Sequence, residues 1–200
     1  MPLRDEVLLD LRSLPANEFV SKRVLDRTPF AFDTLDLFKE WISIFNQAIG
    51  VSVDDITLVG SGAVGISLNP DKNYKEFDAQ SDMDVAVISQ KHFDEAWLFL
   101  RDNHHRRYRL TNNRQRLTWE SHEKRMIYWG AIEADRLLPL LPFARMWVPA
   151  STAASTDAIG NREVKFRIYR DAKALRMYHE KGVRFLQKEL EKASNDPTLY

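Results

Sequence analysis

Hydrophobic positions recur with two different periods along the chain, and the change of period predicts a mixed α/β fold. Four segments carry apolar residues at every third or fourth position, which predicts amphipathic helices over 3–14, 34–48, 90–103 and 171–193. Continuous apolar runs at 56–59 and 85–88 are typical of strands covered on both faces, and we expect them to be central and adjacent. Strict alternation over 163–169 predicts a third strand. The expected fold is a small mixed β-sheet flanked by helices, with additional helices at the N- and C-terminal sides.

Polar and special residues predict where these elements begin and end. Asp33 or Thr34 is expected to cap the second helix, Gly50 to end it, and Ser89 to cap the third. Residues 112–130 fit a helix or a strand, and we favour a helix that ends near Gly130. Prolines at 139, 142 and 149 are expected to break the chain, 150–160 to form a surface loop, and 194–200 to fray.

Composition narrows the class of protein. The 200 residues, of which 44% are hydrophobic, fit one domain over 1–200 with a core at about 34–170 and a C-terminal helix at about 171–193. The absence of cysteine excludes disulfides, thiolate zinc sites and thiol nucleophiles. No apolar run approaches the roughly 20 residues that cross a bilayer, so we expect a cytoplasmic protein without a membrane partner. The 29 basic and 29 acidic residues cancel, so global charge does not require a polyanionic ligand.

Candidate chemistry is concentrated where two predicted strands end and begin. Gly60, Ser61 and Gly62 follow the apolar run 56–59, and small residues there allow backbone N–H groups to approach phosphates. Asp82 and Asp84 open the next strand, and their i, i+2 spacing places both carboxylates on one face. Two close carboxylates repel each other unless a cation neutralises them, and Mg²⁺ with phosphate oxygens fits that role. The pattern predicts a site for a nucleoside triphosphate and its Mg²⁺ or Mn²⁺.

Gly60-Ser61 and Ser81-Asp82-Met83-Asp84-Val85 resemble the signature of the polymerase-β-like nucleotidyltransferase superfamily, and the chain resembles a minimal member. The resemblance implies that Gly60, Ser61, Gly62 and Ser81 bind a nucleotide such as ATP, and that Asp82 and Asp84 hold the metal. It further implies in-line attack of an acceptor hydroxyl on the α-phosphate, with release of pyrophosphate. The chain departs from the family pattern because 62–81 is longer than usual, with an apparent surface turn at 69–73.

A third catalytic carboxylate, which the resemblance also implies, has no obvious position. The strand 163–169 shows Lys165 and Arg167 on its polar face, so Glu163 at its edge is the predicted third catalytic acid. Glu133 and Asp135 are alternatives if the segment before them is extended. Because the polar face of this strand carries basic residues where an acid is expected, a degenerate fold that binds a nucleotide or a partner without transfer is the alternative function. An interaction module without nucleotide is a third reading.

One segment is locally basic. Residues 101–125 contain eight Lys or Arg against three acids, and this charge suits triphosphates or an RNA acceptor, or else forms a solvated surface. A protein acceptor or protein partner is the other expected partner, by analogy with superfamily members that are paired with a second protein. Histidines lack metal-ligand spacing, so no role is assigned to them. Trp119, Trp129 and Trp147 are expected to pack the helical part rather than to stack bases.

Overall fold

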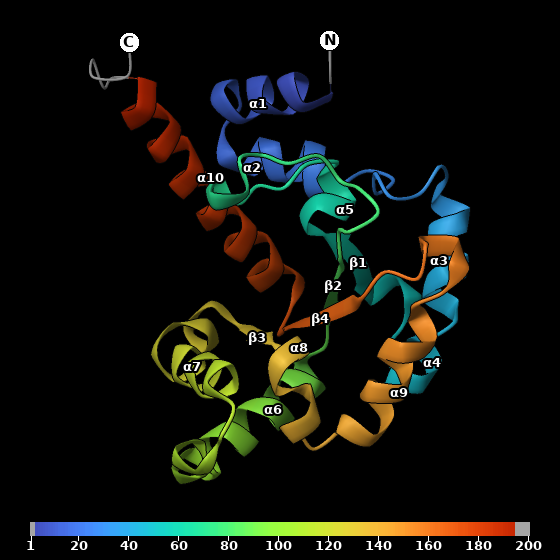
Figure 1. The fold of residues 1–200 in the computed structure, drawn as a ribbon, viewed down its shortest axis with the longest axis vertical. Helices are drawn as coiled ribbons and strands as arrows, with labels where there is room; N and C mark the ends of the chain where they lie inside the picture. The colour runs from blue at the N-terminus through green and yellow to red at the C-terminus, as the bar shows by residue number, and fades with distance from the viewer. Residues whose placement is uncertain (1–2, 195–200) are drawn as a thin grey trace.

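A computed structural model describes residues 3–194 and contains one four-stranded mixed sheet with helices on both faces (Figure 1). The strand order is β1 (Ile56–Val59), β2 (Met83–Ile88), β4 (Val164–Tyr169), β3 (Ala131–Glu133). β2 and β4 are parallel, whereas β1 and β3 run antiparallel to their neighbours. The sequence therefore predicted the class of fold correctly, but it predicted three strands and missed the short β3.

The helices surround this sheet. The α-helices are α1 (Leu3–Ser13), α2 (Ala16–Phe19), α3 (Leu35–Ser43), α4 (Asn46–Ile49), α5 (Gly60–Val64), α6 (Gln90–Asp102), α7 (Asn113–Ser121), α8 (Ala134–Leu137), α9 (Ala144–Ala154) and α10 (Ala172–Ser194). Two π-helical segments, η1 (Val20–Leu25) and η5 (His122–Met126), continue α2 and α7. The short 3₁₀ segments are η2 (Val53–Asp55), η3 (Pro70–Lys72), η4 (His104–Arg109), η6 (Ile127–Trp129), η7 (Leu138–Leu140) and η8 (Asp157–Ile159).

Two hydrophobic cores lie on opposite faces of the sheet. On one face Phe166 of β4 packs against Phe45 and Trp147, with ring centroids 5.6 and 5.3 Å apart. On the other face Ala86 and Tyr169 belong to a core that also contains residues of α1, α5, η1 and α10. Alternate residues of β2 and β4 therefore enter different cores, and this alternation orients every polar side chain of the strands.

Several predicted boundaries are confirmed by local hydrogen bonds. The Thr34 side chain accepts from Leu37 N–H and the Ser89 side chain from His92 N–H, so both residues cap helices as expected. Gly50 has a φ of 67° and ends α4, and Gly130 has a φ of 66° and ends η6. The helix predicted at 34–48 is divided into α3 and α4.

Three predictions were wrong. β1 is an edge strand, although it is adjacent to β2 as predicted, because helices rather than further strands shield it. Pro149 lies inside α9 and does not break it, so residues 150–154 of the predicted loop are helical. Ala150 and Ala154 are buried there, and tertiary packing outweighs the local signal. The prediction of fraying at 194–200 falls almost entirely outside the described residues.

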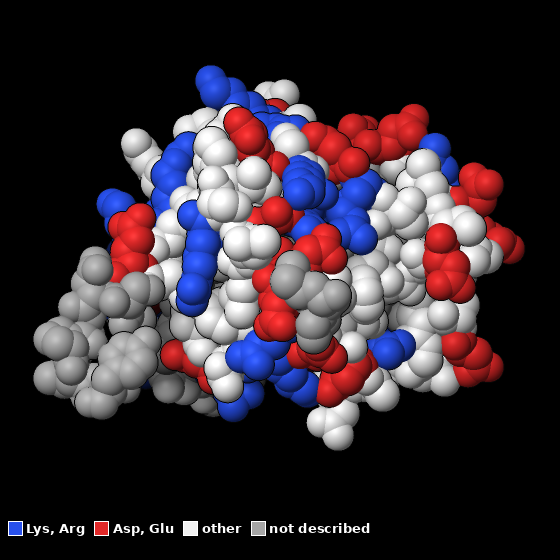
Figure 2. Space-filling model, turned by 90° about the horizontal axis from the view of Figure 1, so that it is seen from above, with Lys and Arg blue, Asp and Glu red and all other residues white. Residues whose placement is uncertain are grey.

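The distribution of charge over the surface matches the balanced composition. In the view of Figure 2, acidic and basic side chains are interspersed over the face, without a large area of one sign. Within residues 3–194, none of the helices combines the length and apolar character needed to span a bilayer.

Candidate functional site

Strand directions bring the predicted site residues to one edge of the sheet. β2 begins at this edge, with Asp82 just before it and Asp84 as its second residue, and β1, which runs the opposite way, ends there at Val59, directly before Gly60. β4 is parallel to β2 and places Lys165 opposite Asp84. Met83 is fully buried in the core on the other face, so Asp82 and Asp84 share the face that Lys165 also occupies. We call this arrangement of Gly60, Asp82, Asp84 and Lys165 the acidic edge.

The carboxylate of Asp84 occupies the space that a side chain at position 60 would need. The φ of Gly60 is +66°, a conformation that residues with a side chain rarely adopt, and a Cβ added there would lie 2.5 Å from Asp84 Oδ2. The glycine is therefore required for two reasons, backbone conformation and space. The proximity of the small residues to the paired acids, which the sequence pattern suggested, is present in the structure.

Asp82 forms an ion pair with Lys165. Burial opposes ionisation, but the hydrogen bond and charge of Lys165 hold the pKa of Asp82 below its ordinary value. The Lys165 Nζ also lies 3.4 Å from Glu163, whose side chain is 72% exposed. Glu163, the predicted third acid, is thus a solvated neighbour of Lys165.

Asp84 has a different electrostatic environment from Asp82. Burial, followed by the nearby charge of Asp82, raises the pKa of Asp84 to about 6, although Arg167 and Lys165 act in the opposite direction. The two acids of the pair therefore have pKa shifts of opposite sign. Paired carboxylates in unequal environments are frequent at functional sites.

A pocket of about 310 Å³ adjoins the acidic edge and carries two lysines. We call it the lysine pocket; it is lined by Ser61, Ser67, Lys72, Lys75, Glu76, Gln80, Ser81 and Asp82. The sequence analysis identified the turn at 69–73 but not this role of Lys72 and Lys75. The only sequence signal was the unusual length of the 62–81 segment.

The inserted segment is folded back on itself, which places the lysines. Ile66 and Glu76 form an antiparallel bridge, and Ser67 N–H donates to the Lys75 carbonyl over 2.7 Å. Lys75 also pairs with Asp78 at 2.7 Å, whereas Lys72 forms no ion pair within residues 3–194. The Lys72 ammonium is therefore available to a ligand in this pocket.

Two of the predicted nucleotide-binding residues have structural contacts of their own. The Ser81 hydroxyl accepts from Asp78 N–H at 3.0 Å and donates to Asp78 Oδ1 at 3.1 Å, which stabilises the turn before β2. Gly62 is buried, and an added Cβ would lie 2.8 Å from Leu58 Cδ2. Ser61 and Ser81 both line the lysine pocket, whereas Gly62 packs against the core.

The alternative third acids lie at and just after the short strand β3, whereas the segment 113–129 before it is helical, as the sequence analysis favoured. β3 ends at Glu133, which is opposite Arg167 of β4. Asp135 lies two residues further on, and its Oδ1 is buried without a hydrogen-bond partner. Burial and then the charge of Glu133 raise the pKa of Asp135. A pocket of about 190 Å³ joins Asp135 to Glu163 and Lys165 on the side of β4 away from β1.

The donor set at the acidic edge suits a hard cation that is shared with a substrate. Among residues 3–194, His, Cys, Asp and Glu do not assemble into a group of three or more that would hold a metal alone. Mg²⁺ is commonly bound through one or two carboxylates plus substrate phosphates and water. Asp82 and Asp84 fit that mode, which requires Lys165 to share or release Asp82.

The basic segment 101–125 does not contribute to the lysine pocket. Arg107 pairs with Glu123, and its guanidinium lies 4.5 Å from the ring centroid of Tyr108. Part of the predicted positive charge is therefore neutralised inside the segment.

Comparisons with known proteins do not assign the chain to a family. No protein-family model matches the chain, and neither the curated proteins nor the solved structures contain a significant match.

Proposed function

We propose that the protein is a magnesium-dependent nucleotidyltransferase that moves a nucleoside monophosphate from a triphosphate such as ATP to a hydroxyl acceptor. We also propose that its sheet is of the type found in the polymerase-β-like superfamily. The observation that carries the proposal is the lysine pocket beside the acidic edge, where Ser61, Lys72 and Lys75 lie next to Asp82. Cationic and hydroxyl groups next to paired carboxylates suit a polyphosphate whose charge is partly neutralised by a metal ion.

The residues of the pocket account for binding. The lysine ammonium groups and the Ser61 hydroxyl would hold the β- and γ-phosphates, which directs the α-phosphate toward Asp82 and Asp84. Mg²⁺ held by Asp82 and Asp84 would supply positive charge that neutralises the transferring and leaving phosphates. Gly60 leaves space for the Asp84 carboxylate, since any side chain there would occupy its position.

The proposed reaction is a displacement at phosphorus. The acceptor oxygen forms a bond to the α-phosphorus, the bond from the α-phosphorus to the oxygen that bridges to the β-phosphate breaks, and pyrophosphate leaves. The hydroxyl proton passes to a carboxylate, for which Asp135 is better placed than Glu163. Asp135 has a raised pKa, its buried Oδ1 has no hydrogen-bond partner, and the residue lines the pocket that Lys165 also lines, which suits a general base.

The second candidate is a nucleotide-binding protein without transfer activity, and the Asp82–Lys165 ion pair favours it. An ammonium in contact with Asp82 competes with a metal ion for the same carboxylate. If Lys165 stays bound in the presence of nucleotide, the pocket still accommodates phosphates, but the charge needed for displacement is reduced. The acceptor in the first case, or the binding partner in the second, would be an RNA or another protein, in the cytoplasm.

Labelled nucleotides separate these candidates. Purified protein is incubated with each α-³²P nucleoside triphosphate, Mg²⁺ or Mn²⁺, and candidate acceptors, and transfer of label and pyrophosphate release are measured. The transferase predicts both signals, and it predicts their loss in Asp82→Ala but not in Asp71→Ala, which removes an exposed acid from the segment 62–81 that precedes Asp82.

Thermal denaturation with a non-hydrolysable triphosphate completes the test. Stabilisation without turnover supports the nucleotide-binding alternative. If the protein shows neither stabilisation nor turnover with any of the four nucleotides, both candidates are contradicted. The remaining reading is then an interaction module.

A further inference from the structure

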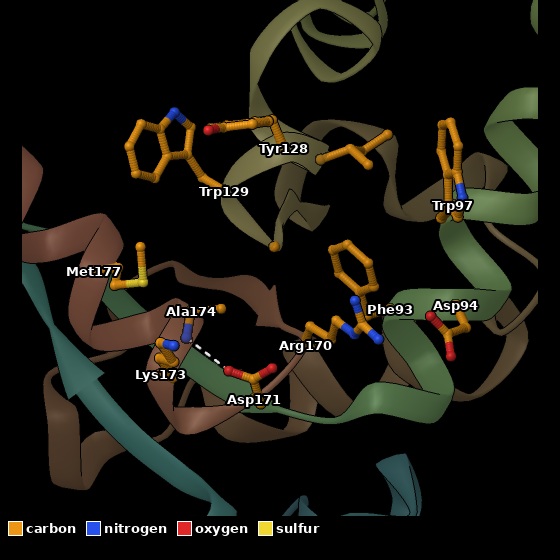
Figure 3. A pocket seen from close by; sticks show the side chains of 12 residues that line it. Phe93, Asp94, Trp97, Tyr128, Trp129, Arg170, Asp171, Lys173, Ala174 and Met177 are labelled. Atoms are coloured by element: carbon orange, nitrogen blue, oxygen red, sulfur yellow. Dashed lines mark hydrogen bonds between the residues drawn. The ribbon is translucent and has the colours of Figure 1, made fainter.

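A second and larger pocket lies at the opposite edge of the sheet, where β2 and β4 end. Its volume is about 640 Å³, and α6, η6 and the beginning of α10 form its walls. Figure 3 shows the indoles of Trp129 and Trp97 on opposite sides of the opening, with Phe93 and Arg170 between them. We call it the aromatic pocket; the side chains that define it are Phe93, Trp97, Tyr128, Trp129, Arg170 and Lys173. None of the residues of the acidic edge lines it.

Aromatic rings in this pocket face solvent. Tyr128 is 84% exposed and meets Trp129 edge to face, with centroids 5.3 Å apart. Trp97 and Trp129 are only partly buried, although the apolar pattern predicted that Trp97 faces inward and that Trp129 packs the helical part. Of Phe93, Trp97 and Trp129, only Phe93 is buried in the core. Large exposed rings carry a cost in water that a stacking ligand would remove.

Cations surround the rings. Lys181 Nζ lies 4.3 Å from the Trp129 ring centroid, and the Arg101 guanidinium lies 6.0 Å from that of Trp97. Arg170 and Lys173 line the pocket and take part in no ion pair between described residues. Of the two acids present, Asp171 accepts a hydrogen bond from Ala174 N–H at 2.7 Å and so caps α10. Asp94 is the other.

We propose that the aromatic pocket binds single-stranded nucleic acid. A base stacks on the exposed face of Trp129 or Trp97, and the adjacent phosphates contact Arg170 and Lys173. Single strands are bound in this way because every base has a flat face and every linkage carries a negative charge. Charge complementarity favours this occupant over an apolar peptide, since the basic segment 101–125 connects two walls of the pocket, α6 and η6. The proposal does not depend on transferase activity.

Fluorescence anisotropy with a labelled 12-nucleotide oligouridine tests the proposal. Trp129→Ala and Trp97→Ala are each expected to weaken binding about tenfold, and Trp129→Phe, which keeps a ring for stacking, is expected to restore most of it. Phe185→Ala is the matched control, because Phe185 is 59% exposed on the same helix as Lys173 but outside the pocket. Arg170→Gln should weaken binding and Asp94→Asn should strengthen it, since they change the charge of the pocket in opposite directions.

Four results would overturn the proposal. In the first, the protein does not bind the oligouridine, and in the second, the two Trp→Ala variants bind it with the same affinity as the wild type. In the third, a duplex of the same length binds with the same affinity as the single strand. In the fourth, free UMP displaces the oligouridine at a concentration equivalent to that of the strand. The last would show that the pocket takes a mononucleotide. Circular dichroism of each variant separates lost binding from lost folding, and the Trp97→Ala variant keeps the test decisive if Trp129→Ala does not fold.

Discussion

The two edges of the sheet carry pockets of opposite design. The acidic edge is assembled from strand ends and carries two acids and Lys165, and the lysine pocket beside it adds two lysines from the inserted segment. The aromatic pocket is assembled from helices, and its groups are exposed rings and cations. The first suits a compact polyphosphate with a divalent cation, and the second suits flat bases on a flexible strand. The sheet therefore places two pockets of different composition at opposite ends of β2 and β4.

The strongest test of this comparison is a crossed pair of variants. Asp82→Asn should reduce nucleotide transfer about a thousandfold, because it removes several kcal/mol of transition-state stabilisation at the phosphates. It should leave oligouridine affinity unchanged. Trp129→Ala should reduce oligouridine affinity and leave transfer to a small acceptor unchanged. Turnover and anisotropy are measured on the same preparations, and loss of both activities in either variant would contradict the separation of the two sites.

Gly60→Ala tests the contact on which the acidic edge depends. The added methyl group meets Asp84 Oδ2 and forces an unfavourable positive φ, so the free energy of unfolding should fall by about 3 kcal/mol. Gly182→Ala is the control, because nothing lies within 4 Å of the added Cβ in the interior of α10. That substitution should stabilise the protein by about 0.5 to 1 kcal/mol. Urea denaturation measures both, and equal effects of the two substitutions would remove the proposed role of Gly60.

Asp84→Asn should stabilise the metal-free protein in a pH-dependent way. The ordinary pKa of Asp84 is 3.8 and burial raises it to about 6, so between these values the folded protein keeps a proton that the unfolded chain has lost. Ionisation therefore lowers the free energy of unfolding as pH rises through this window. The asparagine variant should be more stable by up to about 3 kcal/mol above pH 6 and equal to wild type below pH 4.

Asp82→Asn should change the free energy of unfolding in the opposite direction. The pKa of Asp82 is lowered by Lys165 despite burial, so its charged form contributes stability that is present at neutral pH and lost as pH falls below the ordinary range of an aspartate. This variant should lose stability at pH 7. Denaturation in EDTA over pH 3.5 to 8 compares the two, and shifts of the same sign would contradict the unequal environments of the pair.

The two lysines of the inserted segment should affect triphosphate more than monophosphate. Combined Lys72→Ala and Lys75→Ala should raise the Kd of a non-hydrolysable triphosphate about tenfold, since each exposed charge contributes about 1 kcal/mol or less. The Kd of the corresponding monophosphate should change little, because only the outer phosphates reach the lysine pocket. Calorimetric titration measures both, with Lys91→Ala, an exposed lysine of α6, as the control.

The same comparison explains which features the sequence predicted. Gly60, Ser61, Asp82 and Asp84 were identified because strand termini and an i, i+2 spacing are local patterns. Thr34, Ser89 and Gly50 were identified for the same reason, since caps depend on a few adjacent residues.

The sequence pattern did not predict contacts between segments that are distant along the chain. Lys72 reaches Asp82 only because the inserted segment folds back at the Ile66–Glu76 bridge, and Asp135 approaches Lys165 only because β3 pairs with β4. β3 itself has three residues, too few to show a period. In the aromatic pocket, helical periodicity placed Trp97 on the buried stripe, and its side chain does pack against the core, but it is only partly buried and also lines the pocket.

The smallest expected effect concerns the salt dependence of strand binding. Each phosphate contact of a single strand contributes a slope of about −0.7 to the plot of log K against log salt concentration, because counterions are released. Lys173→Gln should therefore reduce the magnitude of the slope by about 0.7, whereas Lys188→Gln, an exposed lysine further along α10 and outside the pocket, should leave it unchanged. Anisotropy titrations at 50 to 200 mM salt measure the slope. Equal slopes in both variants would mean that the nucleic-acid strand binds through general surface charge and not at the aromatic pocket. The proposed contrast between the acidic edge and the aromatic pocket would then not hold for the aromatic pocket.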